Sequence, residues 1–446
     1  MRANVGQTLS SVNPPKAQSC AVTLLAACLL LVVTLHAQTP QPQHLTLADA
    51  QSLAVQNNPQ YSAAKFNAAA AHQEAPQYRA ARLPALSGAI TGVGADNGSR
   101  IAAGLLNNPS LYSRAASGIT ASQMLTDFGR TSNLVGMANL QAQAQDQAGE
   151  NTRASILLAV TQAYFAVLRA EAVLKVADKT VAARQLVSDQ VTALEQAQLR
   201  STLDVSFANV NLSDAKLLRV QAQNDVNAAQ AELATVMGQP NQTAFDLADE
   251  PMPPALPADL APLVAQAVRN RPDLKNLQLE QAAAERFTKA ERDLYFPTVS
   301  ATAVVGAVPA GVSEVPGRYG AVGLNVNIPI LNGGLFKARE TEAALKAKAA
   351  AQNTSDLANR IIRDVRVAWL NAGTAFERIG LTQELVDQAT QAQDLAETRY
   401  NLGLGSIVEL SQAQLNLTSA QIANASARYD YQAQRVAVDY QTGVLR

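Results

Sequence analysis

The strongest constraint on the fold of this chain is that its second half repeats its first. The segment LPALS at 83–87 precedes FPTVS at 296–300 by 213 positions. Further along, the offset falls to 205 and then stays constant, so that Ser201 aligns with Ser406. A register kept over so long a segment indicates an internal duplication. The chain is therefore expected to contain two structural units of the same kind.

Each half has the same predicted order: helix, strand, loop, strand, very long helix, turn, helix. The change of offset falls between the two strands of each half, where a surface loop tolerates a change of length. The first repeat spans 47–238 and follows a short linker at 38–46, and the second repeat spans 260–446. A proline-rich linker at 239–259 joins them and cannot be helical throughout.

Two segments with no proline and only scattered glycine, 130–199 and 335–402, predict very long helices. Apolar residues recur in both at heptad spacing, and about seventy residues at 1.5 Å per residue make a rod of about 105 Å. Helices of about half that length are expected at 47–82, 203–237, 260–295 and 407–442. The apolar stripes need neighbouring helices, from this chain or from copies of it, to bury them.

Alternation of polar and apolar residues predicts four strands, near 86–95, 116–125, 298–307 and 319–330. In the last of these the apolar residues share one face and the asparagines the other. The apolar residues are Val322, Leu324, Val326 and Ile328. Such a face covers a core or faces lipid, and the pattern alone fits a soluble hairpin equally well. The first-half strands fit less well, because Ser117 and Gln123 fall on the apolar face.

The N-terminus predicts export. A basic start precedes the apolar segment 21–35, which indicates a signal peptide over 1–37 with cleavage after Ala37. A second interpretation is a lipoprotein box, LAAC, ending in Cys28. The other cysteine, Cys20, also lies in this segment, so the chain cut after Ala37 carries no disulfide. An exported chain without a spanning helix crosses a bilayer only as a closed β-barrel, and four strands are too few to close one with a lumen.

Six motifs, in order along the chain, carry a resemblance to a known family. They are LTLADAQSLAVQNNPQY, ARLPAL, QMLTDFG, DLYFPTVS, IPILNGG and RYNLGLGSIVEL. Together with the duplication, they resemble the TolC-type outer-membrane efflux proteins over essentially the whole mature chain. The resemblance implies a mainly α fold with transmembrane β-strands. It also implies a homotrimer with a twelve-stranded barrel in outer-membrane lipid and a long periplasmic helical barrel.

The function implied by the resemblance is a passive exit duct of a tripartite efflux or type I secretion system. Such a duct docks to a periplasmic adaptor, and through it to an inner-membrane pump. The docking residues by resemblance lie in the two turns between the long and short helices. They are Gln198, Leu199, Ser201, Gly403, Leu404 and Ser406, with Gln198 standing where the family pattern usually has glycine.

Asp204 and Glu409 occupy positions where the family keeps carboxylates at the channel entrance. In a trimer each would form a ring of three that favours cations. The alternative is that both are charges at helix N-termini, stabilised by the helix dipole. Gly405 replaces an arginine that locks the gate in one well-known member, and Gln412 replaces a second ring acid. Closed-state contacts are therefore expected to differ here.

Other function classes have little support in the sequence. No grouping of His, Cys or paired acids points to an enzyme, a metal site or a cofactor, and His44 and His72 have no partner at ligand spacing. The 35 basic and 36 acidic residues give no basic surface for nucleic acid. Tyr164 and its repeat equivalent Trp369 are expected to pack in the core. The competing interpretation is a coiled-coil or adhesin-like envelope rod without channel activity, which has no need of the two hairpins.

Overall fold

In a computed structural model, the described residues of the chain are 43–96, 113–241, 244–311 and 316–445. The predicted signal peptide lies outside these ranges. The chain divides into a small unit, to which residues 43–44 and 244–246 belong, and a large unit that holds all other described residues. Strand β1 (Gln43–Leu45) pairs with strand β4 (Phe245–Leu247). In the small unit, His44 Nδ1 lies 3.0 Å from Asp246 Oδ2.

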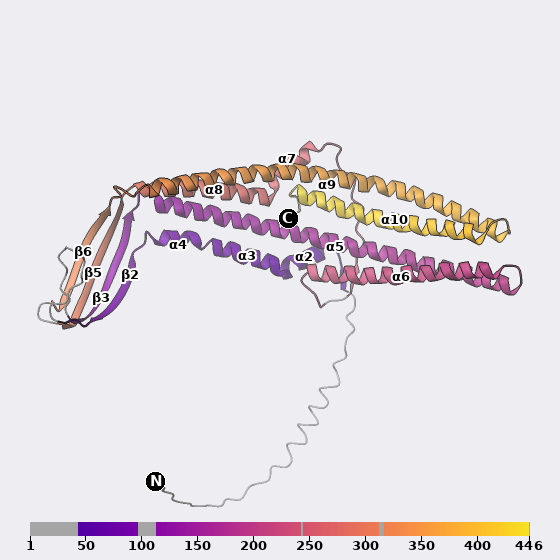
Figure 1. Cartoon of the computed structure of the whole chain (residues 1–446), viewed down its shortest axis with the longest axis horizontal. Helices are drawn as coiled ribbons and strands as arrows, with labels where there is room; N and C mark the ends of the chain where they lie inside the picture. Colours follow the sequence, from indigo (N-terminus) through magenta and orange to yellow (C-terminus); the bar gives the residue numbers. More distant parts are fainter. Residues whose placement is uncertain (1–42, 97–112, 242–243, 312–315, 446) are drawn as a thin grey trace, which may run out of the picture. The chain divides into compact units, whose positions relative to one another are not determined.

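The four longer strands form one antiparallel sheet in the order β2-β3-β5-β6 (Figure 1). The strands are β2 (Ala85–Val93), β3 (Arg114–Thr126), β5 (Thr298–Gly311) and β6 (Arg318–Asn327). Its central pair, β3 and β5, comes from different repeats. The two predicted hairpins therefore join into a single sheet, in which β2 and β6 are the edge strands.

The sheet has one apolar face and one polar face. The register places Leu86, Ala121, Ala303 and Val322 in one row across the sheet. Because side chains alternate between faces, the larger side chains of this apolar face can be listed. They are Leu86, Ile90, Ile119, Val305, Val322, Leu324 and Val326, each between 53% and 90% exposed. Ser117 and Gln123 share this face, as the alternation predicted.

Strand β6 is shorter than predicted. It ends at Asn327, so Ile328 lies just beyond the strand rather than in it. Pro329 has no backbone N–H to give to a ladder, which explains why the pairing stops here. Ile328 is still exposed. Strand β2 likewise ends at Val93, two residues before the predicted end.

The long helices are α5 (Arg130–Gln196) and α9 (Leu335–Asn401), with 67 residues each. Each reverses into a helix of 35 residues, α6 (Thr202–Val236) and α10 (Ile407–Gln441). Helix α5 packs on α6, α9 packs on α10, and α5 also packs on α10 (Figure 1). Equal lengths in equivalent helices agree with the duplication.

The helices predicted as continuous over 47–82 and 260–295 are broken. The first range holds α2 (Leu47–Asn57), α3 (Pro59–Ala71) and α4 (Glu74–Ala80). The second holds α7 (Ala261–Asn270), α8 (Pro272–Arg292) and the short 3-10 turn η1 (Asp293–Tyr295). A proline disfavours the α conformation of the residue before it, and Asn58 and Arg271 both adopt extended ψ angles, 121° and 124°.

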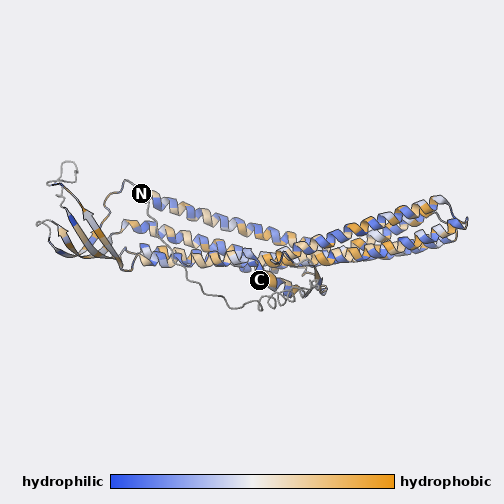
Figure 2. Cartoon of the chain, turned by 90° about the horizontal axis from the view of Figure 1, so that it is seen from below, coloured by the Kyte–Doolittle hydropathy of each residue, from blue (hydrophilic) through white to orange (hydrophobic). Residues whose placement is uncertain are grey.

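Among the described helices, α5 alone is long and apolar enough to cross a membrane by composition. Half of its apolar window is buried against neighbouring helices, as in the core of a helical protein. The core of the large unit is built mainly from alanine and branched aliphatic side chains. Figure 2 shows apolar and polar residues interleaved along all the long helices. The helices thus bury narrow stripes rather than whole surfaces.

Aromatic side chains of the long helices hold the linker between the repeats. The buried Tyr164 hydroxyl lies 2.6 Å from the carbonyl of Ala248, to which it donates, and burial raises its pKa above the usual range. Trp369 Nε1 donates to the Pro257 carbonyl at 3.0 Å. Tyr164 lies in the core as predicted. Trp369 is only half-buried, and its ring nitrogen binds the linker.

Candidate functional site

The two helical hairpins end in turns of the same backbone shape. We call residues 194–204 the first tip and residues 399–409 the second tip. Gln198 and Gly403 occupy equivalent positions with φ angles of +61° and +74°. Glycine adopts this left-handed conformation without steric cost, whereas glutamine does not. The left-handed backbone of Gln198 agrees with the prediction that this residue stands where the family pattern usually has glycine.

Each tip closes with the same backbone hydrogen bond. Leu199 N–H donates to the Leu194 carbonyl and Leu404 N–H donates to the Arg399 carbonyl, both at 2.8 Å. This bond from the sixth residue back to the first is the Schellman ending of a helix. Leu199 and Leu404 then project outward and are among the most exposed apolar residues of the two hairpins.

The predicted carboxylates at the two tips make different contacts. At the first tip Ser201 Oγ accepts from Asp204 N–H, and Asp204 Oδ2 accepts from Ser201 N–H, both at 3.2 Å. This reciprocal pair is a capping box. At the second tip Ser406 Oγ accepts from Glu409 N–H at 3.1 Å. The Glu409 carboxylate instead binds Arg399 Nε at 3.1 Å.

The two tips contact each other through Arg200 and Tyr400. The Arg200 guanidinium lies over the Tyr400 ring, 4.1 Å from its centroid, and Nη2 donates to the Tyr400 carbonyl. Arg200 is the repeat equivalent of Gly405. Neither Arg200 nor this contact was predicted, although the unequal residues at equivalent positions are visible in the sequence.

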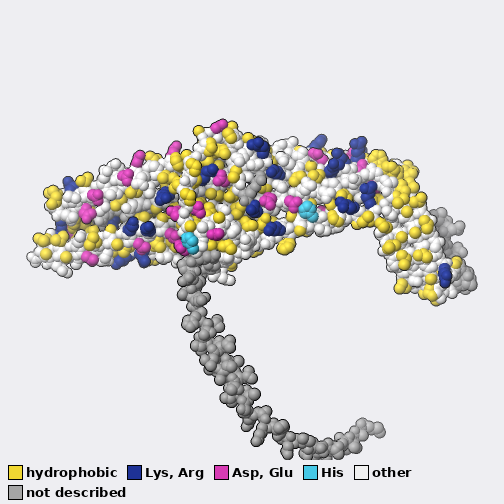
Figure 3. All heavy atoms as spheres, turned by 180° about the vertical axis from the view of Figure 1, so that it is seen from behind, with side chains coloured by type: hydrophobic (Ala, Val, Ile, Leu, Met, Phe, Trp, Pro, Cys, Tyr) yellow, Lys and Arg dark blue, Asp and Glu magenta, His cyan; other side chains and the backbone are white. Residues whose placement is uncertain are grey.

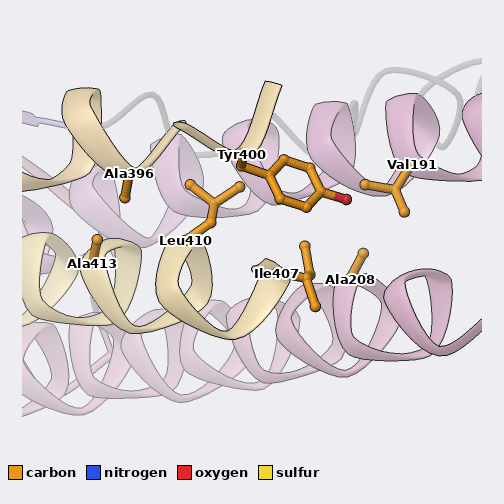
Figure 4. Close-up of a cluster of buried hydrophobic side chains, with 7 residues drawn as sticks. All are labelled: Val191, Ala208, Ala396, Tyr400, Ile407, Leu410 and Ala413. Atoms are coloured by element: carbon orange, nitrogen blue, oxygen red, sulfur yellow. The ribbon is translucent and has the colours of Figure 1, made fainter. Parts of the chain in front are cut away.

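Tyr400 lies in an apolar cluster that joins the two hairpins (Figure 4). The cluster comprises Val191, Ala208, Ala396, Tyr400, Ile407, Leu410 and Ala413. Burial raises the pKa of the Tyr400 hydroxyl, nearby Asp204 adds to the rise, and Arg200 opposes it. Among the described residues, nothing accepts a hydrogen bond from this hydroxyl. The hydroxyl is therefore expected to remain protonated.

A polar layer follows the apolar cluster along the hairpins. Asn211 Nδ2 donates to Ser411 Oγ at 2.6 Å, and the buried Arg184 donates to Gln414. Burial lowers the pKa of Arg184, and the charge of Asp214 opposes that shift. Each of these bonds joins one repeat to the other. The layer therefore holds the register between the two hairpins.

Gly405 and Gln412, the two residues that depart from the family pattern, both lie close to residues of their own hairpin. A Cβ atom at Gly405 would lie 3.2 Å from the Arg399 Cβ and 3.3 Å from the Tyr400 backbone nitrogen. Any side chain at this position therefore crowds the second tip. Gln412 Nε2 donates to Asn416 Oδ1 at 3.0 Å, along the same helix.

The histidines expected to lack partners have acidic neighbours. His72 Nε2 lies 3.0 Å from Asp146 Oδ2, and His44 has the contact with Asp246 described above. Within the described parts of the chain, no group of three metal-binding side chains comes together. Each histidine is thus one half of an exposed polar pair.

The geometry of two hairpin tips and a four-stranded sheet can be compared with known proteins. Residues 50–239 and 263–444 match the profile of a family described as outer membrane efflux protein. The chain belongs to this family. Membership confirms the resemblance inferred from the motifs and the predicted location in the outer membrane. It also agrees with the mainly α fold carrying a β-sheet.

Individual members of the outer membrane efflux protein family are distant in sequence. The outer membrane protein TolC of Escherichia coli is 25% identical over 379 residues, which cover 79% of this chain and 74% of TolC. The outer membrane efflux protein BepC of Brucella suis is 25% identical over 320 residues, covering 70% of this chain and 68% of BepC.

Solved structures show the same fold. The outer membrane protein VceC of Vibrio cholerae matches with a TM-score of 0.75 and 19% identity, over 89% of this chain and 96% of VceC. The open state of the MtrE outer membrane channel of Neisseria gonorrhoeae matches with a TM-score of 0.73 and 21% identity, over 90% of each chain.

Proposed function

We propose that this chain is one protomer of a trimeric, passive exit duct in the outer membrane, serving a tripartite efflux or type I secretion system. The observation that carries the proposal is the sheet. Its apolar face is exposed, and its edge strands β2 and β6 have no further strand beside them among the described residues. In lipid, unpaired strand edges cost several kcal/mol per polar group, so the sheet has to close with copies of itself.

Closure by three copies gives twelve strands. Four strands are too few for a barrel with a lumen, whereas the exposed apolar face suits lipid and the polar face suits an aqueous interior. On the polar face lie Ser87, Thr120, Ser122, Ser300, Thr302 and Asn325. This division supports the proposed lipid contact of Val322, Leu324 and Val326.

The helices support a ring of copies as well. Helix α6 carries an exposed apolar stripe, Leu203, Val210, Leu217 and Val220, and α9 carries another, Leu381, Leu385 and Leu395. Two different stripes suit a head-to-tail contact, in which α6 of one copy packs on α9 of the next, and such contacts form a ring when the rotation between copies closes. The rings then form the proposed periplasmic helical barrel.

The tips are the proposed docking site for a periplasmic adaptor, which links the duct to an inner-membrane pump. Leu199 and Leu404 are 70% and 67% exposed and stand beside the tight reversals at Gln198 and Gly403. Small apolar contacts on a rigid turn suit reversible docking. The proposal assigns no enzymatic step to this chain, since the pump supplies the energy.

Asp204 and Glu409 are proposed to line the entrance. Both lie in the first turn of a helix, and both already have partners in their own chain. The contacts favour a capping role for Asp204, whereas Glu409 is exposed and its charge is partly offset by Arg399. The entrance is therefore expected to prefer cations only mildly.

Substitution of neighbouring residues on β6 tests the proposal. Leu324→Arg places a charge on the apolar face, where it costs about 2–4 kcal/mol at mid-membrane. Asn325→Arg is the matched control, because it places the same charge on the polar face of the same strand. We expect Leu324→Arg to remove the protein from the outer membrane, and Asn325→Arg to leave it there with altered conductance in planar bilayers.

Equal membrane insertion of both variants would contradict the assignment of the faces. A purified wild-type protein that forms no pores in planar bilayers would favour the competing envelope rod. Salt extraction separates the two further, because a duct needs detergent to leave the membrane.

A further inference from the structure

Aromatic side chains gather where the strands meet the helices. Phe128 and Phe296 have ring centroids 6.2 Å apart, and Tyr295 and Phe336 meet edge to face at 5.7 Å. Phe128 follows β3, Tyr295 and Phe296 precede β5, and Phe336 is the second residue of α9. Phe128, Tyr295 and Phe296 are about half exposed. We call these four residues the aromatic girdle.

The girdle continues the apolar face of the sheet. Ile328, Ile330 and Leu331 follow β6 directly, and the last two are more than 90% exposed. Figure 3 shows apolar side chains gathered at this corner, with Lys and Arg side chains on the helices next to it. Exposed aromatics at the end of an apolar surface are typical of the depth at which lipid headgroups begin.

Exposed cations follow within a few residues of the strand ends. Arg82 lies three residues before β2, Arg292 six residues before β5, and Lys337 is the third residue of α9. Lys289 lies one helical turn before Arg292. Among the described residues, no carboxylate lies within ion-pair distance of any of these four. We call them the basic cluster.

Nearby acids are already engaged. Glu291 is only 1% exposed and binds Arg339 at 2.6 Å. Asp293 accepts from Asn133 Nδ2 at 2.7 Å, and the buried Asp127 accepts from Thr131. The charge of Arg82 acts on Asp127, whereas Lys289, Arg292 and Lys337 have no ion pair among the described residues, so their charge is left for a partner outside the chain. Three cations without an ion pair also disfavour burial of this surface between copies.

We propose that the basic cluster binds the headgroups of anionic phospholipids in the leaflet at the helical end of the sheet. The inference rests on the proposed outer-membrane duct, because it takes the apolar face of the sheet as the lipid surface. The girdle sets the depth of the headgroups, and the cations lie where lipid phosphates are found. Attraction of Lys and Arg to an anionic lipid surface then selects the lipid.

The test compares lipid preference in two double variants of the full chain. Arg292→Gln with Lys337→Gln removes half of the basic cluster. Lys175→Gln with Lys216→Gln is the matched control, since both lysines are exposed on α5 and α6 and have no ion pair among the described residues. Binding of phosphatidylglycerol relative to phosphatidylcholine is measured by native mass spectrometry of protein released from mixed vesicles.

We expect the wild type and the control to prefer phosphatidylglycerol, and the cluster variant, which lacks two cations, to lose about 25-fold of that preference, since each cation near an anionic surface contributes about fivefold. Pore conductance is recorded from the same preparations. Pores with no lipid preference, or with a preference unchanged in the cluster variant, overturn this inference and leave the duct intact.

Two other outcomes also count against the inference. Wild-type protein without pores refutes the duct and this inference with it. Displacement of phosphatidylglycerol by millimolar inorganic phosphate shows that the cluster is a site for free anions rather than for lipid.

Discussion

The two tips share a backbone and differ in how side chains stabilise it. The first tip places glutamine in a left-handed conformation and adds a capping box between Ser201 and Asp204. The second tip has glycine in that conformation, and its acid, Glu409, binds Arg399 instead of closing the box. The duplication therefore kept the shape of the turn while its stabilising contacts changed.

The difference makes the second tip depend on the first. Arg200 of the first tip stacks on Tyr400 and binds its carbonyl, whereas its repeat equivalent, Gly405, has no side chain to return the contact. The asymmetry means that movement of either hairpin away from the other has to break the contact of Arg200. Substitutions at both tips test this dependence.

The largest expected effect is that of Gly403→Val. A β-branched residue at a φ of +74° is strained, and we expect a loss of about 2 kcal/mol of local stability. Amide hydrogen exchange of the second tip measures it. Gln198→Val is the matched change, and it should cost less because glutamine already bears part of the strain. Equal losses would show that Gln198 bears no strain in the wild type.

Arg200→Gln should cost about 1.5 kcal/mol, because it removes both a cation–π contact and a charge-assisted hydrogen bond. Faster exchange is expected at both tips, since the side chain joins them. The control is Arg219→Gln, which breaks a half-exposed pair with Asp178 and should change little. Faster exchange at the first tip alone would refute the dependence of the second tip.

Gln198→Gly should stabilise the first tip by about 1 kcal/mol, because glycine relieves the left-handed strain. Slower amide exchange at the end of α5 would show it. A destabilised first tip would mean that the glutamine side chain makes a contact worth more than the strain.

The smallest expected effect on stability is that of Glu409→Gln, at most about 0.5 kcal/mol for an exposed pair. Asp204→Asn is its counterpart and should cost about 1 kcal/mol through the capping box. If Glu409 lines the entrance, its variant lowers the cation preference of single channels by more than the Asp204 variant does. If neither variant changes the ion selectivity, Asp204 and Glu409 act only at the N-termini of their helices.

Much of the fold could be predicted because it follows from local patterns. The long proline-free segments became α5 and α9, and the alternating segments became the four strands. The breaks at Asn58 and Arg271 were missed although each precedes a proline, because the apolar spacing continues across them. Ile328 was placed in a strand for the same reason.

The contacts between the repeats could not be predicted. The pairing of β3 with β5 and the stacking of Arg200 on Tyr400 join residues about two hundred positions apart. The spacing of residues along the chain does not predict which of two equivalent side chains contacts the other hairpin. The sequence likewise does not tell which contact Glu409 makes, because its carboxylate could close a capping box with Ser406 or form an ion pair with Arg399.

The sequence by itself determined the duplication, the long helices, the four strands of the larger sheet and the sidedness of those strands, because helix and strand periodicities are properties of neighbouring residues. Only the tertiary structure decided that two hairpins share one sheet and that one tip supports the other. Those choices depend on packing between distant segments, where shape and hydrogen-bond geometry select among partners that the sequence leaves equivalent.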